Sequence, residues 1–238
     1  MSVQSPPANR ADERVVRAAA RELGGVVSIA VFFLFFILGL MFHSAFATTT
    51  YPAPDEAADL ILEWRRDNGD VSRLSGAALS VSALVFTWFC SWFASVIHRT
   101  GRTQAAFVVL AGGLFSALGL FLSGVLQWIA QRPETLAEVP VLRVVHQITF
   151  VLGGPLVVTS LAPIVAVGGI ALVRAGLLQK WLGYVGVALG VICLGSVVML
   201  IPEDGGLTFL VPIGRFLSLL WLTVVAVVLT RRVGQARS

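Results

Sequence analysis

The sequence contains little charge for its length. Of 238 residues, 13% are charged and 57% are hydrophobic, whereas an average soluble domain has about 25% charged residues. The mean hydropathy is correspondingly high, at +0.87. The 17 basic and 13 acidic side chains are too few to cover a water-soluble surface. The composition therefore excludes an ordinary soluble enzyme and a disordered chain, and it predicts a membrane protein.

Cysteine is also scarce. The two cysteines, Cys90 and Cys193, both lie within apolar runs, and no C-x-x-C spacing is present. This excludes a disulfide-rich secreted domain and gives no support to a thiolate metal site. We expect each cysteine to be a small buried hydrophobic side chain.

Several motifs that would indicate chemistry are missing. The apolar runs contain no carboxylate, which counts against a transporter that is coupled to ions through buried Asp or Glu. There is no H-E-x-x-H, no G-x-S-x-G and no glycine-rich phosphate loop. The basic residues are scattered through the links between apolar runs rather than gathered in a stripe. We therefore predict no catalytic residues, no cofactor, no metal site and no nucleic-acid partner.

Six apolar stretches reach the roughly 20 residues that a helix needs to cross a bilayer. They are residues 26–46, 76–97, 105–130, 144–173, 183–201 and 209–230. The sequence thus predicts an all-α fold, a bundle of six transmembrane helices over residues 24–232. Residues 1–23 and 233–238 flank this membrane domain. A small-residue pattern at Ala45-Phe46-Ala47 resembles a signal cleavage site, but the run before it is too long for a signal core, so we expect an uncleaved span.

The distribution of basic residues predicts the orientation of the bundle. With six spans, eleven Lys and Arg residues fall on the side of the two chain ends and five on the other side, while Arg215 lies within a span. We expect the protein to lie in the plasma membrane. Because cytoplasmic loops are enriched in Lys and Arg, we expect both termini to lie in the cytoplasm. Residues 47–75, 131–143 and 202–208 would then lie outside.

Two segments outside the spans show helical patterns. Residues 11–23 alternate charge with alanine and valine, which is typical of a basic amphipathic helix that either contacts anionic lipid or simply extends the first span. Residues 1–9 are expected to be disordered. In the first external loop, Pro54-Asp55-Glu56 favours a helix start and Asn68-Gly69 its end. This short amphipathic helix would present an apolar face at residues 57, 60, 61 and 64 and place Arg65 off that face, as a packed connector or as a lid over the bundle.

Small residues indicate how the spans pack. Membrane helices approach closely where Gly, Ala and Ser are repeated. Such residues recur over 112–123 and as the pair Gly186 and Gly190, so we expect helix contacts within the protein there. The fourth span contains Gly153-Gly154-Pro155, which predicts a kink or break, a feature that is common in membrane helices and also lines the sites of many transporters.

Few polar side chains lie inside the spans. The candidate ligand-binding residues are His43, His146, Gln147 and Arg215, with Gln127 as a neutral companion. All lie towards the outer ends of their spans, so one interpretation is a shared, outward-facing polar pocket. The alternative is that each reaches the headgroups separately and that Arg215 pairs with Glu203 or Asp204. Paired histidines could also hold a haem, but their place near the interface makes this a weak hypothesis.

The pattern as a whole resembles a family of multi-pass integral membrane proteins common in actinobacteria, a domain of unknown function. The resemblance depends on three loose features: the Tyr51-Pro52-Ala53-Pro54-Asp55 run, the link 176–183, and Trp221 followed by Arg231-Arg232. In that family the link often reads Leu-Pro-x-Trp-Leu-Gly, whereas here Leu178-Gln179 replaces the proline step. The resemblance implies no activity and transfers no catalytic residue.

These observations predict a non-enzymatic integral membrane protein, a scaffold or an accessory subunit of the cell envelope. The alternative is a carrier or binding protein for a small or lipid-like ligand that uses the outward-facing polar cluster. The lipid bilayer is the one expected partner, and a protein partner in the membrane is consistent with the scaffold hypothesis.

Overall fold

The chain is almost entirely helical. The computed structural model describes the backbone of residues 10–200 and 209–235 and the side chains of residues 24–198 and 209–231. The described part is 87% helical and contains no strand. The helices are α1 (Arg10–Ala45), α2 (Ala58–Asp67), α3 (Gly69–Arg99), α4 (Thr103–Ile129), α5 (Pro133–Ala137), α6 (Val139–Val151), η1 (Leu152–Leu156), α7 (Val157–Arg174), α8 (Lys180–Gly195), η2 (Ser196–Leu200) and α9 (Leu210–Gln235).

Six helical segments are long and apolar enough to cross a membrane, so the predicted fold class is confirmed. They span Gly24–Ala45, Gly69–Arg99, Thr103–Ile129, Val139–Arg174, Lys180–Val198 and Leu210–Arg231. Most boundaries differ by five residues or fewer from the predicted ones. The second span begins seven residues earlier than expected, at Gly69 rather than 76, because the polar residues of its first turns continue the helix. The predicted segments 1–9 and 202–208 lie outside the described residues.

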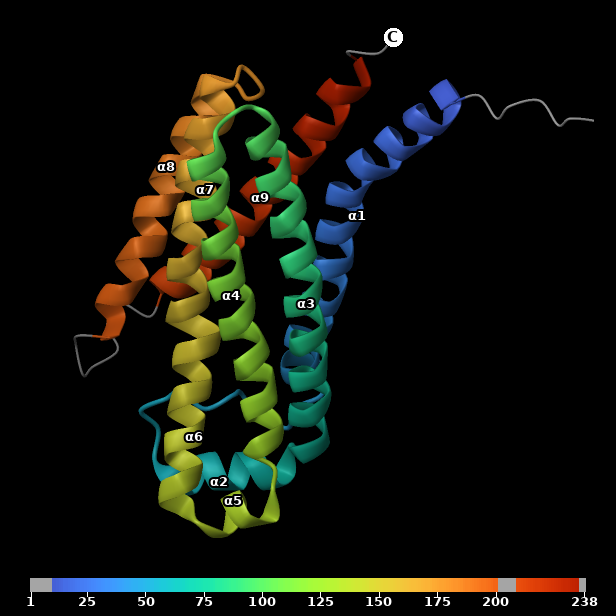
Figure 1. Cartoon of the computed structure of the whole chain (residues 1–238). Coiled ribbons are helices and arrows are strands. Elements are labelled where there is room, and N and C mark those ends of the chain that lie inside the picture. The colour runs from blue at the N-terminus through green and yellow to red at the C-terminus, as the bar shows by residue number, and fades with distance from the viewer. Residues whose placement is uncertain (1–9, 201–208, 236–238) are drawn as a thin grey trace, which may run out of the picture.

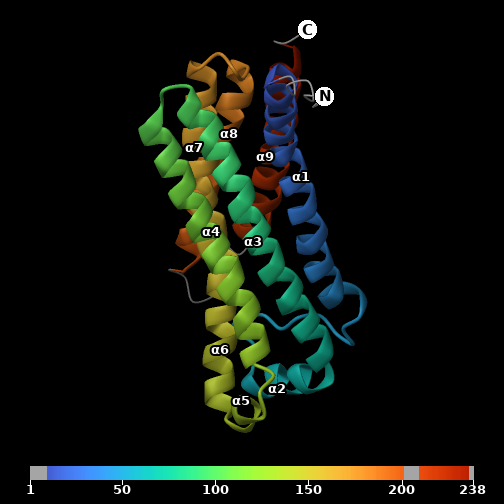
Figure 2. The same ribbon diagram turned by 45° about the vertical axis from the view of Figure 1, so that its right-hand side comes forward.

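The long helices run lengthwise through the bundle, with α1 and α9 inclined to the others, whereas α2 lies across one end (Figure 1). The beginning of α1 and the end of α9 lie at one end of the bundle, and α2 and α5 lie at the opposite end, which we call the α2 end (Figures 1 and 2). The helices α8 and α9 stop short of the α2 end, so that α3, α4 and α6 extend beyond them. The two described ends of the chain therefore lie on the same side, as an even number of spans requires.

Small residues bring the helices into contact as predicted. A Cβ built on Gly119 of α4 would lie 2.8 Å from the carbonyl oxygen of Leu152, and one on Gly76 of α3 would lie 2.5 Å from that of Gly124. In α8, a Cβ on Gly186 would lie 2.5 Å from the carbonyl oxygen of Val165 in α7. These distances leave no room for a side chain, so the small residues act within the protein.

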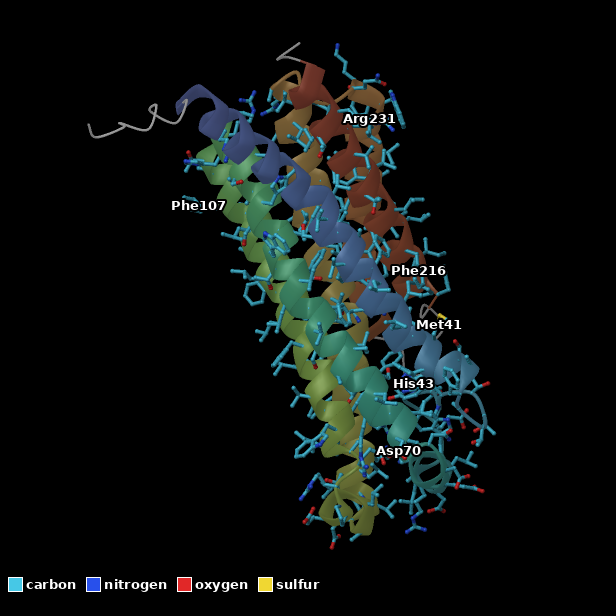
Figure 3. The ribbon with its side chains drawn as sticks, turned by 90° about the vertical axis from the view of Figure 1, so that its right-hand side faces the viewer. Met41, His43, Asp70, Phe107, Phe216 and Arg231 are labelled. Atoms are coloured by element: carbon cyan, nitrogen blue, oxygen red, sulfur yellow. The ribbon has the colours of Figure 1, made fainter. Side chains whose placement is uncertain are left out.

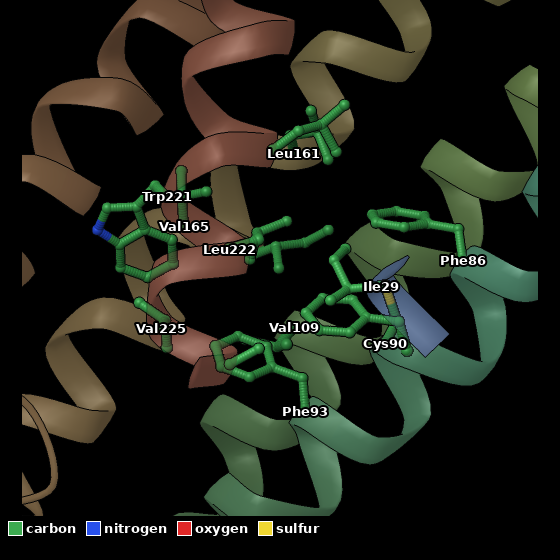
Figure 4. Close-up of a cluster of buried hydrophobic side chains, with 14 of the residues drawn as sticks. Ile29, Phe86, Cys90, Phe93, Val109, Leu161, Val165, Trp221, Leu222 and Val225 are labelled. Atoms are coloured by element: carbon green, nitrogen blue, oxygen red, sulfur yellow. The ribbon is translucent and has the colours of Figure 1, made fainter. Parts of the chain in front are cut away.

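The centre of the bundle is apolar and closely packed (Figure 4). Phe86, Phe89 and Phe93 follow each other along α3 and form stacked or tilted ring contacts with α1 and with each other. Large apolar side chains also lie on the outside, such as Phe107 (65% exposed) and Phe216, which appear on opposite sides of Figure 3. An apolar interior surrounded by an apolar exterior is what a bilayer, rather than water, accommodates.

The predicted kink in the fourth span takes the form of a π-helical turn. The segment α6–η1–α7 is one continuous helix in which Gly153-Gly154-Pro155 lies in η1. In a regular α-helix the N–H of Val157 would donate to the carbonyl of Gly153, but here it donates to Gly154. The N–H that would bond to the Gly153 carbonyl in a regular helix is therefore used elsewhere, and π-turns of this kind are frequent at functional sites.

Candidate functional site

The helix α2 packs an unexpected face against the bundle. It begins at Ala58 rather than at Pro54, and its buried residues are Ile61, Trp64 and Arg65. Leu60, which the sequence places on the buried face, is 52% exposed. The prediction of the helix is therefore confirmed, and Ile61 and Trp64 of the predicted face are buried, but the predicted start at Pro54 and the burial of residues 57 and 60 are wrong. Arg65 is the centre of the contact, with 0% of its surface exposed.

Arg65 is held by hydrogen bonds from three parts of the chain. Its guanidinium donates to Ser72 Oγ at 2.5 Å, to Tyr51 Oη at 2.8 Å and to His146 Nδ1 at 3.3 Å. The rings of Tyr51 and Trp64 each lie 5.4 Å from the guanidinium carbon, within cation–π range. Among the described residues, no carboxylate lies within 4.0 Å of this cation. We call Tyr51, Trp64, Arg65, Ser72 and His146 the arginine cluster.

These contacts define the protonation of His146. Its Nδ1 faces the N–H of Arg65, which can only donate, and its Nε2 lies 3.2 Å from the carbonyl oxygen of Pro52, which can only accept. His146 is therefore neutral, with the proton on Nε2. In this form it joins the start of α6 to both Arg65 and the chain segment before α2.

Tyr51 belongs both to the arginine cluster and to the wall of a cavity between the helices. Its ring contacts three other rings, with centroid separations of 5.0 Å to His43, 4.9 Å to Trp64 and 5.1 Å to His146. Its hydroxyl accepts from Arg65, and Tyr51 also lines a cavity between the helices. Tyr51 is thus the residue that the arginine cluster and that cavity share.

The cavity has a volume of about 290 Å³, which is at the lower end of small-molecule sites. We call it the central cavity. Its walls come from five of the helical spans and from Tyr51. They consist of Phe36, Leu40, His43, Tyr51, Leu79, Leu120, Ser123, Gln127, Thr149, Phe150, Gly153, Gly154, Val211 and Arg215.

His43, which lines this cavity, carries a hydrogen-bond acceptor without a partner. The single proton of the Ser75 hydroxyl is donated to the carbonyl oxygen of Gly39 at 2.7 Å. Ser75 Oγ must then accept from His43 Nδ1, which lies 2.9 Å away. In the neutral ring this leaves His43 Nε2 as a bare acceptor, and that atom is buried without a hydrogen-bond partner.

Arg215 contributes a positive charge to the wall of the same cavity. Its Nη2 donates to the carbonyl oxygen of Gly153, which lies in the π-turn. Its guanidinium carbon lies 6.0 Å from the ring centroid of Phe36. Within the described part of the chain, no carboxylate forms an ion pair with it. Glu203 and Asp204, its predicted partners, lie outside the described residues.

Three polar groups of the cavity residues have no partner. The buried atoms His43 Nε2, Gln127 Oε1 and Arg215 Nε form no hydrogen bond. They combine two acceptors with one charged donor in residues that surround a single space. Because buried polar atoms in native proteins are nearly always paired with protein, water or ligand, this set is the strongest sign of a binding site.

The predicted site residues divide into three groups. His43 and Arg215 line the central cavity together, as the shared-pocket hypothesis requires. His146 is buried behind Tyr51 rather than in the cavity wall. Gly153, whose carbonyl accepts the hydrogen bond from Arg215, lies seven residues further along the same helical span, which is about 10 Å. Gln147 is not in the pocket, because it is exposed and donates to the carbonyl of Pro54. The four residues therefore do not form one cluster at one level.

Sequence reasoning missed Tyr51 and Arg65. One indication was available for Arg65, since its spacing of four from Ile61 places both on one helical face. Nothing local indicates that Tyr51 enters the bundle. As for metals, no group of three or more His, Cys, Asp or Glu side chains within residues 24–198 and 209–231 is arranged to hold an ion.

Comparisons with protein-family models, with curated proteins and with solved structures found no match. The resemblance to an actinobacterial membrane family therefore stays a prediction. The function has to be inferred from the geometry of the chain itself.

Proposed function

We propose that this integral membrane protein binds a small amphiphilic ligand in the central cavity, without catalysing a reaction. The observation that supports this is the set of unpartnered buried atoms on His43, Gln127 and Arg215 around one space of about 290 Å³. A scaffold needs no such space, and leaving these atoms without partners costs about 1–3 kcal/mol each, more for the charged group.

The walls specify the chemistry of the ligand. Arg215 favours an anionic or strongly accepting oxygen, while His43 Nε2 and Gln127 Oε1 favour a hydroxyl or N–H group nearby. The remaining wall is largely apolar, with Phe36, Leu120 and Val211 among its side chains. A molecule with a polar head that both accepts and donates, joined to a compact apolar part, matches this arrangement.

We further propose that the protein lies in the plasma membrane with both termini in the cytoplasm. The asymmetry of Lys and Arg between the two sides supports this orientation. The α2 end and the central cavity next to it would then face the cell exterior. A reporter at the C-terminus that is protected from externally added protease in intact cells is the expected result, and a cleaved reporter would reverse the orientation.

The binding proposal is tested by filling the cavity. Gly154 lies on its wall, and a Cβ built there would meet Val211 and Phe150 only at ordinary distances of 3.8 Å and 4.0 Å. Gly154→Leu should therefore fold and occupy part of the space. Gly24→Leu is the matched control, because a Cβ on Gly24 has no neighbour within 4 Å.

The measurement is extraction of the purified proteins in mild detergent, followed by mass spectrometry of the small molecules released. The wild type and Gly24→Leu should retain the same amphiphile at near-stoichiometric amounts, and Gly154→Leu should lose most of it. If all three release only bulk lipid in equal amounts, the binding proposal fails and the scaffold or accessory-subunit hypothesis becomes the better account.

A further inference from the structure

A second recess, separate from the central cavity, lies at the corner where α2 meets α3. It has a volume of about 400 Å³. It is lined by Arg65, Arg66, Asp67, Asn68, Gly69, Asp70, Val71, Arg73, Gln131 and Leu136. We call it the α2–α3 recess. It shares Arg65 with the arginine cluster but no residue with the central cavity.

Two buried donors in this recess have no partner. Arg65, with 0% of its surface exposed, leaves its Nε unpartnered, and Gln131, with 5% exposed, leaves its Nε2 unpartnered. The oxygen of the Gln131 side-chain amide borders the start of α3, because a Cβ built on Gly69 would be 3.3 Å from Gln131 Oε1. Both orphaned atoms are N–H groups, so only an acceptor can satisfy them.

The start of α3 adds further donors. The first N–H groups of a helix have no partner within the helix, and no side chain caps α3. Asn68 occupies the cap position, but its side chain bonds instead to Thr48 and to the carbonyl of Trp64. A helix of 31 residues therefore begins at the recess with its positive dipole end uncapped.

The charges around the recess also favour an anion. Arg65, Arg66 and Arg73 supply three positive charges against the two negative charges of Asp67 and Asp70. Both aspartates are exposed to solvent, and Asp70 is paired with Arg73 at 3.3 Å. The buried groups are thus donors and a cation, while the carboxylates lie at the rim.

We propose that the α2–α3 recess binds a phosphate-type oxyanion. Its several acceptor oxygens match a recess whose lining residues carry the unpartnered donors Arg65 Nε and Gln131 Nε2 and the uncapped amides at the start of α3. The phosphate can belong to a lipid headgroup or be free in solution. Trp128, one turn before Gln131, is 52% exposed and stacks with Arg132, a pairing typical of the membrane–water interface where lipid phosphates lie.

The test uses the full chain in a neutral detergent and three probes. Inorganic phosphate, dihexanoyl phosphatidic acid and dihexanoylglycerol, which lacks phosphate, are titrated at constant ionic strength while the thermal midpoint and the binding isotherm are recorded. We expect saturable binding of phosphatidic acid, of inorganic phosphate or of both, and none of dihexanoylglycerol. Binding of both phosphates identifies a free-phosphate site, and binding of phosphatidic acid alone identifies a headgroup site.

Variants of Gln131 assign the binding to the recess. Gln131→Leu removes the donor at similar volume and should weaken binding about tenfold or more, and Gln131→Glu adds a negative charge and should abolish it. Gln104→Leu, an exposed change at the other end of α4, should have no effect. The proposal is overturned if no phosphate probe saturates, if dihexanoylglycerol binds equally, or if Gln131→Leu binds like the wild type. The cavity-filling variant Gly154→Leu should bind phosphate normally, so failure of one proposal leaves the other standing.

Discussion

Replacing Arg65 by methionine should release α2 from the bundle. Methionine has a similar length but lacks the N–H groups that donate hydrogen bonds to Ser72, Tyr51 and His146. Since these contacts join α2 to α3, to the preceding link and to α6, their loss should be felt first as local opening of α2. The six spans, which have their own apolar contacts, should remain folded.

The expected magnitude follows from the contacts. A hydrogen bond to a charged group contributes about 1.5–3 kcal/mol, so three bonds give a gross contribution of about 5–9 kcal/mol. Burial of the guanidinium offsets part of this, since desolvation costs several kcal/mol for each ion. The net loss on Arg65→Met should be about 2–4 kcal/mol, which corresponds to an increase in local opening of about 30-fold to several hundred-fold.

Hydrogen–deuterium exchange of the α2 amides in detergent or nanodiscs measures this opening. Arg66→Met is the matched control, because it makes the same change at the next residue, whose side chain is exposed. Arg65→Lys should rescue little, since one ammonium group cannot reproduce the fixed fork that meets three acceptors. If the α2 amides of Arg65→Met exchange at rates within about threefold of those in Arg66→Met, the arginine cluster does not hold α2 and the reasoning is refuted.

Two further predictions concern the packed interior. Gly119→Val should lower stability by about 1–3 kcal/mol, because its Cβ would lie 2.8 Å from a backbone oxygen that cannot move independently, whereas Gly24→Val should leave the thermal midpoint nearly unchanged. Cys90 and Cys193, both 0% exposed, should resist a maleimide in the folded protein and react after denaturation in dodecyl sulfate. Rapid labelling without denaturant would show that the bundle opens in a way that the packing does not allow.

The six spans could be predicted from sequence because their cause is local. A run of about 20 apolar residues is sufficient for a spanning helix, whichever neighbours it later contacts. The same applies to the small residues of α4 and to Gly186 and Gly190, whose spacing places them on one face. Their specific partners in α7 could not be predicted, since nothing in either run identifies the other.

The buried face of α2 was mispredicted for the opposite reason. A hydrophobicity pattern places Leu60 inside and Arg65 outside, because it scores each side chain by its transfer from water. Arg65 is buried because Tyr51, 14 residues earlier, and His146, 81 residues later, supply hydrogen bonds and rings around it. Such partners are distant in the sequence, so a buried cation of this kind becomes evident only once the chain is folded.

The π-turn and Arg215 are two separate features of the sequence that contact each other in the folded chain. The sequence marks Gly153-Gly154-Pro155 as a place where the helix is disturbed and Arg215 as the single charge within a span. In the structure Gly153 lies in the π-turn, and its carbonyl accepts a hydrogen bond from Arg215. A neutral carbonyl orients the guanidinium and leaves its charge in place, whereas a carboxylate would neutralise that charge. Arg215 is thus fixed at the wall of the central cavity with its positive charge still available to a ligand.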